Sequence, residues 1–100
     1  MELGGDYTKM SKKRNRLEVI YDILKAINAK NGTIKPTHIL YKSNLSHKMM
    51  NEYLTDLIDK GFVEEHNVSG GKTYSLTPKG FEYINKYKFI VEFSDSFGLD

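Results

Sequence analysis

The side chains of this sequence that could do chemistry are mostly basic, and they are concentrated in its first half. Between Lys9 and Lys48 there are ten lysines and arginines but only two acids, which gives this stretch a local net charge of +8. The whole 100-residue chain carries only +2, because its remaining residues are acidic in balance. A polyanion would therefore be attracted to the first half of the chain.

The sequence gives little support for a metal site or a catalytic site. There is no cysteine, which excludes thiolate metal ligands and thiol catalysis. The three histidines, His38, His47 and His66, are scattered and lack the i, i+4 spacing of metal ligands. The adjacent carboxylates of Glu64 and Glu65 are accompanied by no nucleophile motif or phosphate-binding loop. We therefore expect a protein that is not an enzyme and that has no metal, no cofactor and no evident small-molecule ligand.

The length and composition predict a single small domain, since ordinary domains have about 100–150 residues. Hydrophobic residues make up 39% of the chain, and the fraction stays below the usual ~45–50% when glycine is counted in place of tyrosine. The core should therefore be thin, with room for a partner surface to complete it. The longest apolar run has three residues, at 89–91, against the ~20 that a membrane span needs. The sequence shows no signal peptide, so we expect a soluble cytoplasmic protein.

Apolar periodicity and helix-ending residues predict three helices in the first 60 residues. These helices cover about 12–30, 36–42 and 46–60, with a loose arm at 1–10 and a stub of strand at 33–35. Ser11 and Ser46 are suited to cap the first and third helices. Pro36 suits the first turn of the second, and Gly61 suits the end of the third. The connection between the second and third helices is so short that it indicates a helix-turn-helix.

The remaining residues predict a β-hairpin and a fourth helix. The strands are expected at 62–68 and 72–76, on either side of a turn that contains two glycines. Thr77 and Pro78 then suit the start of a helix that extends to about residue 93. The whole order predicts an α+β, mainly α, fold: a winged helix-turn-helix with an added C-terminal helix. Its parts are an arm at 1–10, the winged domain at 11–77, the last helix at 78–93 and a tail at 94–100.

Four segments carry a resemblance to a known family: Leu17 to Leu24, Tyr41 to Ser46, Tyr53 to Val63, and Tyr74 to Gly80. They resemble the successive signatures of small archaeal winged-helix proteins, among them the 10a-type nucleoid-associated DNA-binding proteins and related transcriptional regulators. The resemblance implies that the chain binds duplex DNA in the nucleoid, as a regulator or a nucleoid protein. It also implies that the third helix enters the major groove, where base edges can be distinguished.

On this resemblance, DNA contacts are expected at the start of the third helix and around it. The predicted set is Arg14, Lys42, Ser43, Asn44, Ser46, His47, Lys48, Asn51 and Lys72. Lysine and asparagine side chains suit guanine and adenine, and basic side chains suit phosphates. Asp56 and Asp59 would be repelled by DNA, so only the first two turns of the helix are expected to dock. The alternative for each of these positions is an ordinary solvated side chain.

The last helix is apolar around more of its circumference than a one-sided surface helix requires. The 10a-type relatives pair this helix with its two-fold mate, so the resemblance implies a homodimer. The predicted interface is Tyr83, Ile84, Tyr87, Ile90 and Val91. The alternative is that the helix packs on the first helix of its own chain, with Phe97 and Leu99 folding back. The rival function is a winged helix that contacts protein in a larger assembly, which the modest net charge and the late acids of the third helix favour.

Overall fold

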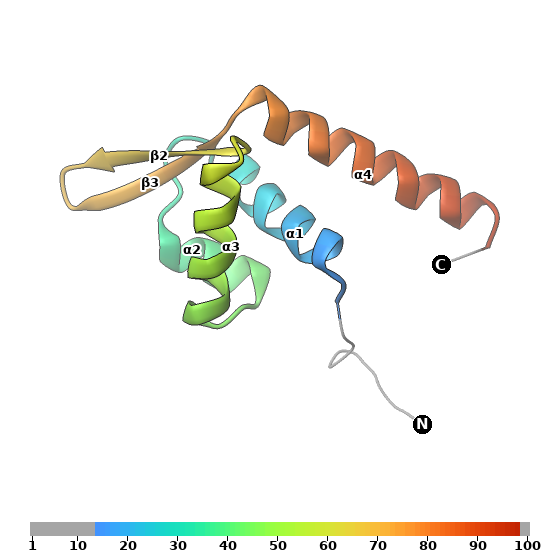
Figure 1. Ribbon diagram of the computed structural model, residues 1–100, viewed down its shortest axis with the longest axis horizontal. Helices are drawn as coiled ribbons and strands as arrows, with labels where there is room; N and C mark the ends of the chain where they lie inside the picture. The colour runs from blue at the N-terminus through green and yellow to red at the C-terminus, as the bar shows by residue number, and fades with distance from the viewer. Residues whose placement is uncertain (1–13, 99–100) are drawn as a thin grey trace.

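The computed structural model describes residues 14–98, in which a helical body carries a two-stranded hairpin on one side and a long C-terminal helix that projects from the other (Figure 1). The elements are α1 (Arg16–Ala29), α2 (Pro36–Ser43), α3 (His47–Asp59), β2 (Val63–Val68), β3 (Gly71–Leu76) and α4 (Pro78–Ser96). This is the predicted order, and the predicted fold class is confirmed. The predicted arm at 1–10, the cap Ser11, the basic residues Lys12 and Lys13, and Leu99 lie outside the described residues.

The first helix begins later than the sequence predicted. Asn15 is its N-cap, with an extended backbone and a side-chain oxygen that accepts a hydrogen bond from the Glu18 N–H at 2.8 Å. Asparagine favours this position because its side chain satisfies a backbone donor that the first turn leaves unpaired. The carboxylate of Glu18 also lies favourably at the positive end of the helix. The prediction that residues 14 and 15 are helical is therefore wrong.

The core is built around α1, whose Ile23, Leu24 and Ile27 are fully buried. The loop after α1 contributes Ile34, which is also fully buried and forms an isolated antiparallel bridge with Tyr74 of β3. This bridge is the predicted stub of strand. The other helices, the segment between α2 and α3 and the hairpin complete the core with Ile39, Leu45, Met50, Leu54, Leu57, Val63 and Leu76.

The hairpin pairs Val63 with Leu76 at its base and Val68 with Gly71 at its tip. Gly70 has a φ of +92°, a conformation that favours glycine because other residues have a Cβ atom that clashes there. At the base, the side-chain oxygen of Asn31 accepts a hydrogen bond from the Leu76 N–H at 2.7 Å. The hairpin is therefore fixed to the end of α1.

The first half of α4 packs on α1, and its second half extends beyond the body (Figure 1). The Tyr87 ring stacks on Tyr21 of α1 at 4.6 Å between centroids, and the Tyr83 hydroxyl donates to the Leu17 carbonyl oxygen at 2.7 Å. The helix continues to Ser96, so residues 94–96, which the sequence placed in a tail, are helical. No helix among residues 14–98 combines the length and apolar character needed to cross a bilayer.

Candidate nucleic-acid interface

The third helix has the two faces that the sequence predicted. Met50, Leu54 and Leu57 are buried against the core, each less than 5% exposed, and Tyr53 is half-buried. The opposite face is exposed and carries His47, Lys48, Asn51, Glu52, Thr55 and Asp59. A polar face therefore extends along the whole outer side of α3.

The start of α3 is favourable for an anion. The Ser46 hydroxyl caps the helix by accepting from the Met49 N–H at 3.2 Å, so this side chain is used within the helix. The first turn contains no acid and contains the exposed Lys48. Because the N-terminus of a helix carries the positive end of its dipole, the helix and the lysine attract negative charge to the same place.

The acids of α3 lie further along the helix, and one of them is paired. Asp56 accepts a hydrogen bond from Arg16 at 2.7 Å and forms a second ion pair with Lys60. The hydrogen bond from Lys60, together with the charges of Lys60 and Arg16, lowers the pKa of Asp56. Glu52 and Asp59 remain exposed. The second half of α3 is thus less suited to a polyanion than the first.

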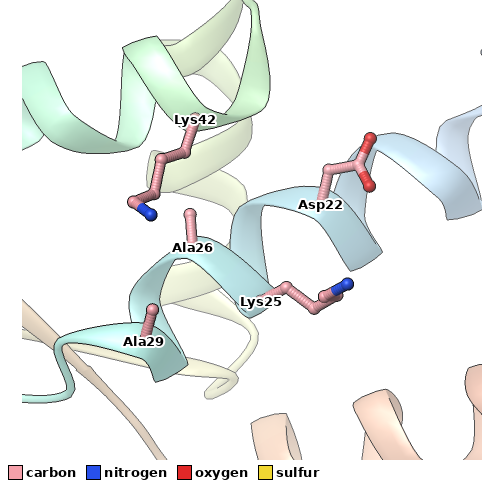
Figure 2. A pocket seen from close by; sticks show the side chains of 5 residues that line it. All are labelled: Asp22, Lys25, Ala26, Ala29 and Lys42. Atoms are coloured by element: carbon pink, nitrogen blue, oxygen red, sulfur yellow. The ribbon is translucent and has the colours of Figure 1, made fainter.

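The segment before α3 differs from its prediction at one residue. Ser43 extends α2 one residue past the predicted end at Lys42, and Asn44, with a left-handed φ of 54°, lies in the turn. The Ser43 side chain is fully buried and has no hydrogen-bond partner, so it cannot contact a phosphate and leaves the predicted set. Lys42 is exposed and extends toward Ala26, over a pocket of about 320 Å³ between α1 and α2 (Figure 2).

The two arginines at the start of α1 are both engaged within the chain. Arg14 donates to the Asp22 carboxylate at 2.7 Å and to the Asn44 carbonyl oxygen at 3.1 Å. Arg16 binds Asp56 and also lies over the Tyr53 ring, 5.3 Å from its centroid. The predicted phosphate contact by Arg14 would therefore compete with its partners in the folded chain.

The hairpin offers one exposed lysine. Lys72 is half exposed, and its ammonium lies 3.5 Å from the Glu65 carboxylate. Asn67, directly opposite in the register, is exposed as well. His66 is half-buried, and its ring nitrogen shares a hydrogen bond of 2.7 Å with the Ser75 hydroxyl of the opposite strand. The positive charge of the hairpin is thus small and partly offset.

Comparisons with known proteins decide the family. Residues 13–94 match the winged helix-turn-helix family. The chain belongs to this family. It is 38% identical over 83 residues to the uncharacterized protein MJ0290 of Methanocaldococcus jannaschii, an alignment that covers 83% of this chain and 36% of that protein. It is 34% identical over 79 residues to the uncharacterized protein MJ0287 of the same organism, covering 73% of this chain and 79% of that protein.

A solved structure shares the same winged-helix fold. Sso10a-2, a DNA-binding protein from Sulfolobus solfataricus, superposes with a TM-score of 0.72 at 20% identity, covering 84% of this chain and 85% of that one. The resemblance to archaeal winged-helix proteins that the sequence suggested is therefore confirmed. In the terms of this family, α2 and α3 form the helix-turn-helix and the hairpin is the wing.

One exposed residue of the helix-turn-helix escaped the sequence reasoning. Tyr41 on α2 was not among the predicted DNA contacts, but its side chain is 88% exposed, whereas Ile39 is fully buried. The signal was present in the spacing, because residues two apart lie about 200° apart around a helix. Tyr41 stands beside Lys42 and presents a hydroxyl to solvent.

The predicted dimer residues divide into two groups. Tyr83, Ile84 and Tyr87 are half-buried and pack on their own chain, and burial raises the pKa of Tyr83 to about 12. Ile90 is 60% exposed and Val91 is 39% exposed. Phe89 and Phe93 in this half of α4, and Phe97 directly after it, are each more than half exposed. The first half of α4 thus packs on α1 of its own chain, which was the alternative to a dimer contact. The second half is uncovered.

Proposed function

We propose that this winged helix-turn-helix protein binds duplex DNA with the first two turns of α3 in the major groove. The observation that carries the proposal is the exposed cluster of His47, Lys48 and Asn51 at the capped, acid-free start of the helix. A helix fits the major groove, where lysine can donate to guanine acceptors and asparagine can pair with adenine. The relative Sso10a-2, which shares the fold, is a DNA-binding protein, which supports the same role here.

The residues around α3 would hold the DNA backbone. Lys42 and Tyr41 on α2, Asn44 in the turn and Lys72 on the wing are exposed side chains that can donate to phosphate oxygens. Each lysine that neutralises a phosphate releases counterions and adds about −0.9 to the slope of log affinity against log salt. Contacts of this kind position the protein but carry no sequence information. A regulator and a nucleoid protein would both use them.

The uncovered half of α4 is proposed to pair with a second copy of the chain. Phe89, Ile90 and Phe93 are exposed there, with Phe97 directly after the helix. Burying one such side chain is worth about 1.5–3 kcal/mol. The charges also favour self-pairing, because this half of the helix has lysines before Ile90 and acids after it. Antiparallel pairing centred on Ile90 would place Lys88 of one copy beside Glu92 of the other. The homodimer could then place two α3 helices on one duplex.

The function is tested by a fluorescence anisotropy titration of mixed-sequence duplex DNA at two salt concentrations. We expect the wild type to bind at low salt and to weaken as salt rises, with Lys48→Ala and Asn51→Ala binding more weakly. Lys86→Ala is the matched control, because Lys86 is an exposed lysine of α4 paired with Glu82. The control should bind as the wild type does.

Absence of binding by the wild type at low salt would contradict the proposal. It would instead favour a winged helix that contacts protein, for which the exposed acids Glu52 and Asp59 and the apolar end of α4 would be the surfaces. Equal binding by Lys48→Ala, Asn51→Ala and the wild type would show that DNA is bound elsewhere than at α3.

A further inference from the structure

We infer that Arg14 and Arg16 are positioning residues, which hold α3 and the turn before it against the start of α1, and that they do not neutralise phosphates. Together with their partners Asp22, Asn44 and Asp56 they form what we call the arginine clamp. The inference rests on the proposed DNA binding for its main readout. Local positive charge alone would instead suggest that both arginines bind a polyanion.

The Arg14 side chain spans three parts of the chain. Its two terminal nitrogens donate to different acceptors, the Asp22 carboxylate on α1 and the Asn44 carbonyl oxygen in the turn between α2 and α3. The side chain is only 25% exposed. A planar guanidinium can direct two donors at fixed angles, which a lysine ammonium cannot do in the same way. Arg14 thereby joins the start of α1 to the helix-turn-helix.

The turn that Arg14 holds is short and has a special conformation. Among residues 14–98, Asn44 alone combines a side chain with a positive φ, and its backbone N–H closes α2 by bonding the Leu40 carbonyl oxygen. Leu45 is buried and donates to the same oxygen at 3.3 Å. Because α3 begins at His47, directly after the cap, any shift of the Asn44 peptide moves the DNA-facing end of α3.

Arg16 holds α3 at a second point, further along the helix. Its guanidinium binds Asp56 at 2.7 Å and lies over the Tyr53 ring. Asp56 also binds Lys60, so the carboxylate connects α1 with the last turn of α3 and its C-cap. Two fixed points define the direction of a helix as well as its position. The clamp therefore sets how α3 is presented to the groove.

The charge balance of the clamp also argues against a phosphate role. Each arginine has one aspartate within hydrogen-bond distance, so the charges of the clamp residues cancel, and only Lys60, which shares Asp56 with Arg16, adds a positive charge beside them. The side chains of both pairs keep 25–60% exposure, and ion pairs that solvent reaches contribute little to folding stability. The expected consequence of breaking them is therefore a change in binding without loss of the fold.

The decisive experiment compares wild type, Arg14→Lys, Arg14→Ala and Asp22→Ala in anisotropy titrations with mixed-sequence duplex DNA, at a temperature where melting curves show each variant folded. If Arg14 positions α3, Asp22→Ala weakens binding although it removes a negative charge, and Arg14→Lys does not restore binding. We expect both alanine variants to lose about fivefold or more in affinity. A loss of this size corresponds to the loss of one weak base contact. Their double variant should be little weaker than either single variant, because both break the same unit.

A phosphate role for Arg14 gives the opposite signs. Asp22→Ala would then bind DNA more tightly, because it frees the guanidinium and removes a repelling charge, and Arg14→Lys would bind nearly as the wild type does. Either result overturns the inference, as does equal affinity of all four proteins. Asp59→Ala serves as the charge control, since Asp59 is an exposed acid of α3 outside the clamp.

A second measurement separates the clamp from the proposed function, because it needs no DNA. Hydrogen exchange of the Leu45 amide reports on the turn directly, through its bond to the Leu40 carbonyl oxygen. Arg14→Ala and Asp22→Ala should speed this exchange, while Lys48→Ala leaves it unchanged. If the exchange is faster in these two variants while the wild type does not bind DNA, the clamp is supported and the proposed function is refuted. Unchanged exchange would refute the clamp.

Discussion

Replacing Gly80 by alanine tests how α4 is seated on the winged domain. Gly80 lies in the first turn of α4, and a Cβ atom there would be 2.5 Å from the Phe62 carbonyl oxygen, a distance that real Cβ atoms essentially never show. It would also lie 3.3 Å from the Leu76 side chain. The same carbonyl oxygen accepts the Thr77 N–H at 3.2 Å, so the backbone cannot move away without weakening that bond.

The magnitude follows from three opposing effects. Overpacking a tight site costs about 1–3 kcal/mol, and weakening the Thr77 hydrogen bond costs about 1 kcal/mol. Alanine returns about 1 kcal/mol, because it favours the helix over glycine. We therefore expect Gly80→Ala to lower the free energy of unfolding by about 1–3 kcal/mol. Each kcal/mol corresponds to about 4–8 °C in Tm for a domain of this size.

The assay is thermal and urea denaturation followed by circular dichroism, at one protein concentration for all variants because association changes apparent stability. Asn85→Ala is the matched control, since Asn85 is an exposed residue of the same helix where alanine should be neutral or slightly stabilising. If Gly80→Ala were as stable as the control, α4 would not rest on Phe62 as described. The position of α4 would then depend on the contacts of Tyr83 and Tyr87 with α1 alone.

Three further predictions concern a cap, a titration and the dimer. Ser46→Ala should lower the free energy of unfolding by about 1 kcal/mol in denaturation experiments, whereas Ser46→Asn should keep most of the wild-type stability because asparagine also caps helices. Equal losses in the two variants would show that the cap does not stabilise α3. The pKa of Tyr83 is raised to about 12 from 10.0 by burial, so the folded state holds the proton more tightly than the unfolded chain. Stability should therefore fall as pH rises from 10 toward 12, and Tyr83→Phe should reduce that fall; an unchanged alkaline profile would contradict the burial. In sedimentation, Phe93→Glu should dissociate the proposed dimer and Asn85→Glu should not, while a monomeric wild type would refute self-pairing through α4.

Much of the fold could be predicted because its determinants are local. Period and capping residues identified four helices and a hairpin, and Pro36 and Pro78 stand at the first position of α2 and α4. The misplaced start of α1 is also local in origin. The sequence reasoning chose Ser11 as the cap although Asn15, three residues before Glu18, has the spacing of a capping pair.

The candidate site was harder to predict, because the partners that decide its chemistry come from distant parts of the chain. Arg14 was predicted to contact DNA, but in the folded chain it binds Asn44, 30 residues away in sequence. Arg16 likewise binds Asp56, 40 residues away. Asp56 looked repulsive for the same reason. A helical face can be deduced from spacing, but the pairing of charges between helices requires the tertiary structure.

The proposed dimer surface shifted for a related reason. Apolar spacing could not show which side of α4 is covered by its own chain. In the structure, Tyr83 and Tyr87 contact α1. What remains exposed is the end of the helix around Phe93. The sequence predicted a thin core that a partner surface could complete, and the exposed apolar side chains lie mainly on the part of α4 that extends beyond the body (Figure 1).

Backbone amide chemical shifts, followed as duplex DNA is added at low salt, show most directly whether the first two turns of α3 contact DNA. We expect the largest changes at His47, Lys48 and Asn51, with smaller ones at the wing around Lys72. Residues of α4 beyond Tyr87 should change little. Changes confined to α4 or to the acidic end of α3 around Asp59, with residues 47–51 unaffected, would contradict the account.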